Sequence, residues 1–120
     1  RRYIVEFGIG MDFHGQDVSK AAAKAVRDAT TKSCLCGLQE LLGMTTEDMA
    51  EKVLVTVTVA VSRPEEVETA RVAACLPVGK VEVKAVRGGL TVPGICVPAF
   101  GDKDESIEVA IACVEVGIVE

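Results

Sequence analysis

The stretch Val53-Leu-Val-Thr-Val-Thr-Val-Ala-Val61 decides the fold, because valine occupies every second position without a break. Side chains alternate between the two faces of a β-strand, so the five valines share one face. The pattern therefore predicts a strand whose valine face is fully buried. The intervening side chains are Leu54, Thr56, Thr58 and Ala60. They are small or mixed, and we expect their face to lie against a helix or another subunit.

Two segments are expected to form helices on this sheet. From Val18 to Ala29, apolar residues recur at helical spacing and form one alanine-rich stripe. Ser62-Arg-Pro-Glu65 resembles a capping box with proline in the first turn, and it predicts a helix that continues to about Leu76. Between the first helix and the valine strand, residues 34–51 predict a connecting lobe with a short leucine-rich helical segment and a capped turn at Thr45–Asp48.

Three further strands are predicted, at residues 3–8, 80–86 and 107–119. The segment between the last two is rich in glycine and proline, which is typical of an irregular excursion or a β-arm. Residues 1–120 thus predict a single α+β domain of order β-α-β-α-β-β, with a four-stranded mixed sheet and two helices on one face. The other face of the sheet stays open, and an open face in a small protein usually marks an interface.

Composition argues against several classes of function. Only 3% of the residues are aromatic and the net charge is −5, so the chain lacks both stacking platforms and the positive charge that nucleic acid requires. No apolar run reaches the length of a membrane span, so we expect no membrane insertion. The five cysteines are an odd number in mostly apolar patterns, which favours reduced thiols in a soluble, intracellular protein, cytoplasmic or organellar. Because the sequence begins at Arg1 without a methionine, a removed transit peptide stays an open alternative.

The candidate site is the stretch Gly8-Ile-Gly-Met-Asp-Phe-His-Gly-Gln-Asp17, which contains the only histidine of the protein. If the chain stays extended past Gly10, Asp12 and His14 point to one side. We predict that both are catalytic, with His14 as general base or metal ligand and Asp12 orienting it. The alternative is that the two side chains only hold the shape of the loop. Asp17 is expected to cap the following helix.

Several other residues are candidates for ligand binding. Glycines let the backbone approach a ligand, although Gly88 and Gly89 could equally make a bulge. Asp102 and Lys103 would line the same pocket from a neighbouring subunit, or would be ordinary turn residues. The candidate ligand-binding residues are Gly8, Gly10, Gly15, Asp17, Gly88, Gly89, Asp102 and Lys103. No cofactor is assigned, and metal binding is left open, since Cys34 and Cys36 are too closely spaced for the usual zinc knuckle.

Three motifs together resemble a known family: Glu6-Phe-Gly-x-Gly-x-Asp-x-His-Gly-Gln-Asp17, Gly88-Gly-Leu-x-Val-Pro-Gly94 and Phe100-Gly-Asp-Lys103. It is the family of small conserved hypothetical proteins named after a Listeria open reading frame (the Lin family), and the resemblance runs the full length of the chain. This family carries no established activity. The predicted element order is also similar to the chorismate mutase-like fold of the YjgF-type deaminases and to one repeat of the cyanuric acid hydrolase and barbiturase enzymes. That similarity of topology implies a homo-oligomer, with a trimer favoured, and ligand sites between subunits.

The sequence therefore predicts an uncharacterised conserved protein that acts as a small-molecule enzyme of hydrolase or lyase type. Its site would lie between subunits, around the Gly-x-Gly-x-Asp-x-His-Gly loop at residues 8–15. Two alternatives remain. One is a non-catalytic module that binds a small anionic or cyclic metabolite, and the other is a structural oligomeric module whose open sheet face is its functional surface.

Overall fold

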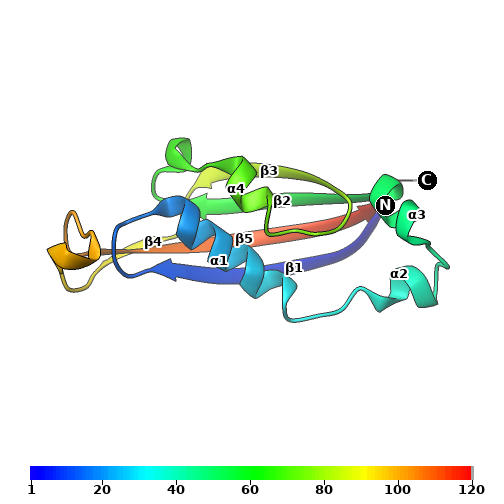
Figure 1. Ribbon diagram of the computed structural model, residues 1–120, viewed down its shortest axis with the longest axis horizontal. Helices are drawn as coiled ribbons and strands as arrows, with labels where there is room; N and C mark the ends of the chain where they lie inside the picture. The colour runs from blue at the N-terminus through cyan, green and yellow to red at the C-terminus, as the bar shows by residue number, and fades with distance from the viewer. Residues whose placement is uncertain (120) are drawn as a thin grey trace.

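The computed structural model describes residues 1–119 and shows one mixed five-stranded sheet with helices packed on one face (Figure 1). The strands are β1 (Arg2–Asp12), β2 (Val53–Val61), β3 (Lys80–Arg87), β4 (Leu90–Pro93) and β5 (Ser106–Ile118). Their order is β1-β5-β2-β3, with β5 antiparallel to both neighbours and β3 parallel to β2. The short strand β4 pairs antiparallel with β5 beyond the end of β2. The prediction of four strands is wrong by one, because the β-arm after β3 adds a short strand to the sheet.

The helices of residues 1–119 are few and mostly short. They are α1 (Val18–Thr30), α2 (Cys36–Glu40), α3 (Thr46–Lys52) and α4 (Thr69–Ala73), with single 3₁₀ turns η1 (Pro64–Glu66) and η2 (Pro98–Phe100). Helices α1 and α4 lie on the same face of the sheet, as predicted, and both contribute to the core beneath them (Figure 1). Helices α2 and α3 form the connecting lobe. The capped turn that was predicted there is present: the Thr45 hydroxyl accepts from the Asp48 N–H, and the Asp48 carboxylate accepts from the Thr45 N–H.

The predicted helix from Ser62 to about Leu76 is wrong in extent. Only η1 and the five-residue α4 form there, because Val67 between them has extended backbone (ψ 125°). Ser62 does not cap a helix. Its hydroxyl and its N–H both donate to the Glu108 carboxylate on β5, so the side chain serves the sheet instead.

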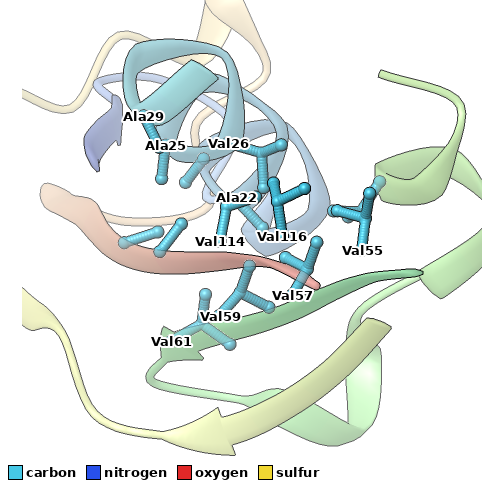
Figure 2. Close-up of a cluster of buried hydrophobic side chains, with 14 of the residues drawn as sticks. Ala22, Ala25, Val26, Ala29, Val55, Val57, Val59, Val61, Val114 and Val116 are labelled. Atoms are coloured by element: carbon cyan, nitrogen blue, oxygen red, sulfur yellow. The ribbon is translucent and has the colours of Figure 1, made fainter. Parts of the chain in front are cut away.

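The core lies between α1 and the sheet, and its side chains are small (Figure 2). All five alternate valines of β2 are buried, which confirms the prediction from the valine pattern. Burying one such side chain stabilises the fold by about 1.5–3 kcal/mol. The stripe of α1 is buried as predicted: Val18, Ala21, Ala22, Ala25, Val26 and Ala29. The low aromatic content therefore produces a thin interior built from valine and alanine.

Two glycines of β1 set the distance between the sheet and α1. A Cβ on Gly8 would stand 2.1 Å from the Ala25 carbonyl oxygen, and one on Gly10 would stand 2.4 Å from the Ala21 carbonyl oxygen. The helix backbone thus lies almost in contact with the strand backbone. Gly8 and Gly10, which were predicted to approach a ligand, approach the helix instead.

The opposite face of the sheet carries a row of exposed apolar side chains. We call this row the apolar stripe and define it as Val5, Phe7 and Ile9 of β1, Ile111 of β5, and Leu90 and Val92 of β4. Strand register places them on one face, since Ile9 pairs with Ile111 and the glycines between the β1 members point toward α1. Counted along β5 from the partner of Val5 to the partner of Val92, the stripe is about 26 Å long at ~3.3 Å per residue.

The molecule is elongated, with extents of 51 × 24 × 21 Å and a Cα radius of gyration of 15.9 Å. A compact domain of this length has a radius of gyration of about 13.6 Å. Much of the excess comes from the long strands and from the β4–η2 arm, which extends beyond the helix layer (Figure 1). Within residues 1–119, no helix has the length and apolar character needed to cross a membrane.

Candidate active site

The only histidine of the chain lies in the loop between β1 and α1 and is held by a carboxylate from the far end of the sequence. His14 Nδ1 stands 2.6 Å from Asp102 Oδ2, across 88 residues of sequence. The His14 side chain is 36% exposed, whereas the Asp102 side chain is shielded completely. Because Nδ1 is engaged, Nε2 is the ring nitrogen left to face a ligand. This arrangement of a part-exposed imidazole on a shielded carboxylate is the one used in general acid–base catalysis.

Asp102 fixes the shape of two loops at once. Besides His14, its carboxylate accepts from the N–H groups of Gly15 and Val97, both at 2.7 Å, and from the Gln16 amide at 3.3 Å. Removal from water raises the pKa of Asp102, but the hydrogen bonds from Val97, His14, Gly15 and Gln16 outweigh this and hold it at about 2. Asp102 is therefore a carboxylate at neutral pH, and its contact with Nδ1 can fix the orientation of the His14 ring.

Gln16 joins the same two loops from the other side. Its amide oxygen accepts from the Lys103 N–H at 2.9 Å, and its amide nitrogen donates to the Ser106 carbonyl at 2.9 Å. Gly15 and Gln16 both have positive φ, at 91° and 50°, so the chain folds back sharply just after His14. The loop before α1 and the loop before β5 are thus closed against each other by side-chain bonds.

Asp12 does not have the predicted role of orienting His14. It is 1% exposed and lies under the start of α1, where it accepts from the Asp17 N–H at 2.8 Å and pairs with the Lys20 ammonium at 3.4 Å. The prediction assumed that strand alternation continues past Asp12, whereas β1 ends at that residue and the chain then turns. The orienting carboxylate is Asp102.

Asp17 is the N-cap of α1, as predicted, and its carboxylate accepts from the Lys20 N–H at 3.1 Å. It also pairs with Arg71 of α4 at 3.1 Å. Partial burial raises the pKa of Asp17, but the bonds from Lys20 and Arg71 outweigh it and give a net lowering. The side chain thus holds α1 to α4 and is committed to protein partners.

The remaining predicted ligand-binding residues fall into two groups. Gly88 and Gly89 form the tight turn between β3 and β4; Gly89 has φ 71°, and a Cβ there would stand 2.2 Å from the Val109 carbonyl oxygen. They shape the turn rather than a ligand site. Asp102 and Lys103, by contrast, reach the His14 loop, and they do so within one chain rather than from a neighbouring subunit.

Phe100 is a part of the site that sequence reasoning missed. Its ring meets the His14 imidazole edge-on, with centroids 5.0 Å apart and planes at 69°. Phe100 and Phe13, which precedes His14 in the sequence, are both exposed. A pattern of covarying positions would reveal the pairing of the two loops, whereas a single sequence holds no local signal for it.

A polar cleft lies beside the dyad, on the Gln16 side. It contains a cavity of about 210 Å³, and Glu108, which is 2% exposed, lines it. The lining residues are Gln16, Ser62, Arg63, Thr91, Lys103, Asp104, Ser106 and Glu108. Within residues 1–119 no three histidine, cysteine or acidic side chains converge as a metal site, and the five cysteines are unpaired.

The fold and the site together define a small α+β domain with a His–Asp dyad at the junction of two loops. The chain belongs to the family described as "Conserved hypothetical protein (Lin0512_fam)", whose model matches residues 2–116, and the predicted family is thereby confirmed. The structure is similar to the crystal structure of an FtsZ-like protein of unknown function from Nostoc punctiforme PCC 73102. The two share 37% identity with a TM-score of 0.86, over 100% of this chain and 96% of the other. No curated protein matches the chain in sequence.

Proposed function

We propose that this protein is a small-molecule enzyme of hydrolase or lyase type in which His14 acts as the general acid–base and Asp102 orients it. The observation that carries the proposal is the 2.6 Å contact between His14 Nδ1 and the shielded Asp102 carboxylate. A carboxylate on Nδ1 holds the neutral ring with its lone pair on Nε2, where a proton can be accepted from water or from substrate.

Each side chain has a distinct part in such a reaction. His14 Nε2 takes the proton, and Asp102 offsets the positive charge that then develops on the ring. The low pKa of Asp102, at about 2, keeps it ionised throughout this transfer. Phe100 limits the orientation of the ring by its edge-on contact. General acid–base catalysis of this kind contributes about 10²–10⁴ in rate.

The proposal includes assembly into a homo-oligomer, with a trimer favoured. It also includes a chorismate mutase-like arrangement of the domain and a location in a reducing intracellular compartment. The apolar stripe supports assembly, because contiguous exposed apolar surface of this kind is typical of protein interfaces. A second copy is the occupant that the stripe suits, since all six members are uncharged and two acidic chains can meet there without opposing like charges. The stripe extends along β1 and β4 toward Phe13 and Phe100, so a packed copy would also shield the dyad from water.

The test is turnover of a defined mixture of cellular metabolites, followed by mass spectrometry of what is consumed and formed. We expect the wild-type protein to convert a component that His14→Ala leaves unchanged, while Lys84→Ala on β3, the sheet edge opposite β1, behaves as wild type. Native mass spectrometry of the same samples reports the assembly. Conversion that is equal in His14→Ala would refute the role of the dyad, and a monomeric wild-type protein would refute the intersubunit site alone.

A further inference from the structure

We propose that the cavity beside Glu108 is a binding site for a small zwitterion of amino-acid size. The ligand's ammonium would lie at Glu108 and its carboxylate at Lys103. This site is separate from the His14–Asp102 dyad, and the inference goes beyond the proposed catalytic function.

The first support is a buried carboxylate with no cation of its own. Glu108 is 2% exposed, and its hydrogen-bond partner is Ser62, through the hydroxyl and through the N–H at 3.4 Å. In the described part of the chain, no lysine, arginine or histidine forms an ion pair with it. An ionised carboxylate offers about four acceptor positions, and burying one without a compensating charge is costly.

The neighbouring carboxylate shows the contrast. Asp12 is the cross-strand partner of Glu108 in the β1–β5 register and is buried to the same degree. Asp12, however, is paired with the Lys20 ammonium. Directly opposite positions have Cβ atoms about 4.5–5.5 Å apart, so the two carboxylates are close neighbours, and the Lys20 ammonium pairs with Asp12 rather than with Glu108.

The second support is a cation in the same cavity with no partner. Of the two cations that line it, Arg63 is engaged with Glu66 at 3.2 Å and with the Gln16 carbonyl at 2.5 Å. Lys103 is exposed and forms no ion pair with any residue from 1 to 119, and it also lines an adjoining cavity at the start of α1. The other carboxylate of the cavity, Asp104, accepts from the Ser106 N–H and hydroxyl in its own turn.

These pairings leave one negative and one positive group for a ligand. A ligand that carries one ammonium and one carboxylate satisfies both, whereas a simple anion or a simple amine satisfies only one. The volume of about 210 Å³ is below the range of about 300–1,000 Å³ that is usual for ligand pockets, so the cavity suits a small ligand. Ser62, Thr91 and Ser106 also line the cavity.

The experiment is isothermal titration of the full chain with glycine, β-alanine, γ-aminobutyrate and 5-aminovalerate, whose charged groups are progressively farther apart. Acetate and ethylammonium are the single-charge controls. We expect at least one member of the series to bind, with an affinity that reports the separation of Glu108 and Lys103, and the single-charge controls to bind at least about tenfold more weakly.

Two variants and two matched controls assign the binding to this cavity. Glu108→Gln keeps the shape of the side chain and its contacts with Ser62, and Lys103→Met changes an exposed position, so both should fold. Each is expected to weaken binding at least about tenfold, while the matched exposed changes Glu82→Gln and Lys84→Met on β3 leave it unaltered. The proposal is overturned if no member of the series binds the wild-type protein, or if binding is unchanged in both cavity variants.

Discussion

Replacing Gly8 by alanine should loosen the whole helix–sheet contact, although it adds only one methyl group. The new Cβ would stand 2.1 Å from the Ala25 carbonyl oxygen and 2.4 Å from the Ala29 nitrogen, whereas ordinary contact begins at 3.4 Å. Both obstacles are backbone atoms of α1, so no side-chain rotation relieves them. The helix would have to move by roughly 1.3 Å, the difference between 3.4 and 2.1 Å.

A shift of that size affects every contact of the buried stripe of α1. A gap of 0.5–1 Å already forfeits roughly a quarter to a half of the dispersion energy of a contact. Overpacking in a core usually lowers the free energy of unfolding by about 1–3 kcal/mol. Because rigid backbone atoms block this site, we expect Gly8→Ala to lower it by about 3 kcal/mol or more. Urea unfolding followed by circular dichroism, at one fixed protein concentration, measures the free energy of unfolding.

Gly43→Ala is the matched control. Gly43 has φ 63° but nothing within 4 Å of an added Cβ, so its cost is backbone strain alone, about 1 kcal/mol. Gly8 has no positive φ, so its cost would be steric alone. A Gly8→Ala protein within about 1 kcal/mol of wild type, at an unchanged urea dependence, would refute the argument that close backbone contact sets the helix position.

Three further predictions concern the dyad and the apolar stripe. The pKa of Asp102 is about 2 in the folded protein, against 3.8 for an unperturbed aspartate, so its contribution to the free energy of unfolding is complete above pH 3.8 and is lost as the pH falls toward 2. Urea unfolding across this pH window should therefore show a steeper loss of stability for the wild-type protein than for Asp102→Asn. Nitrogen chemical shifts of His14 should show the neutral ring protonated on Nδ1, and Asp102→Asn should mix the two tautomers; an equal mixture in wild type would contradict the dyad. Phe7→Asp, at a stripe position that is 62% exposed, should dissociate the proposed homo-oligomer, as measured by light scattering, while Leu41→Asp, 83% exposed outside the stripe, should not. Dissociation by both variants, or by neither, would contradict the assignment of the stripe.

The parts of the fold that sequence predicted correctly are those with a long, strict period. The valines of β2 and the stripe of α1 each repeat over more than eight residues, so burial on one face is the only arrangement that suits them. The region from Ser62 to Leu76 lacks such a repeat. There the local sequence pattern predicts that Ser62 caps a helix. In the structure the Ser62 hydroxyl instead donates to the buried Glu108 carboxylate on β5.

The sequence pointed to His14 and the glycine-rich loop as a candidate site, but it did not identify the carboxylate that contacts the histidine. Asp12 is two residues from His14, whereas Asp102 is 88 residues away, and only the packing of the two loops brings it close. For Gly8 and Gly10, the close backbone approach was predicted, but the approaching group was not. A glycine is required wherever backbones approach, and the sequence does not distinguish a ligand from a helix as the approaching group.

Strand β5 shares one edge between two partners, β2 along most of its length and β4 near its start. The change of partner falls at the Gly88–Gly89 turn, so β4 pairs with β5 without entering the β2–β5 ladder, and Asp102 further along the same arm contacts the His14 loop. Relatives with longer, shorter or differently sequenced arms could therefore vary the surroundings of His14 while the valine core keeps its register. In evolutionary terms, the sheet separates the residues that folding requires from those whose substitution would alter the surroundings of His14.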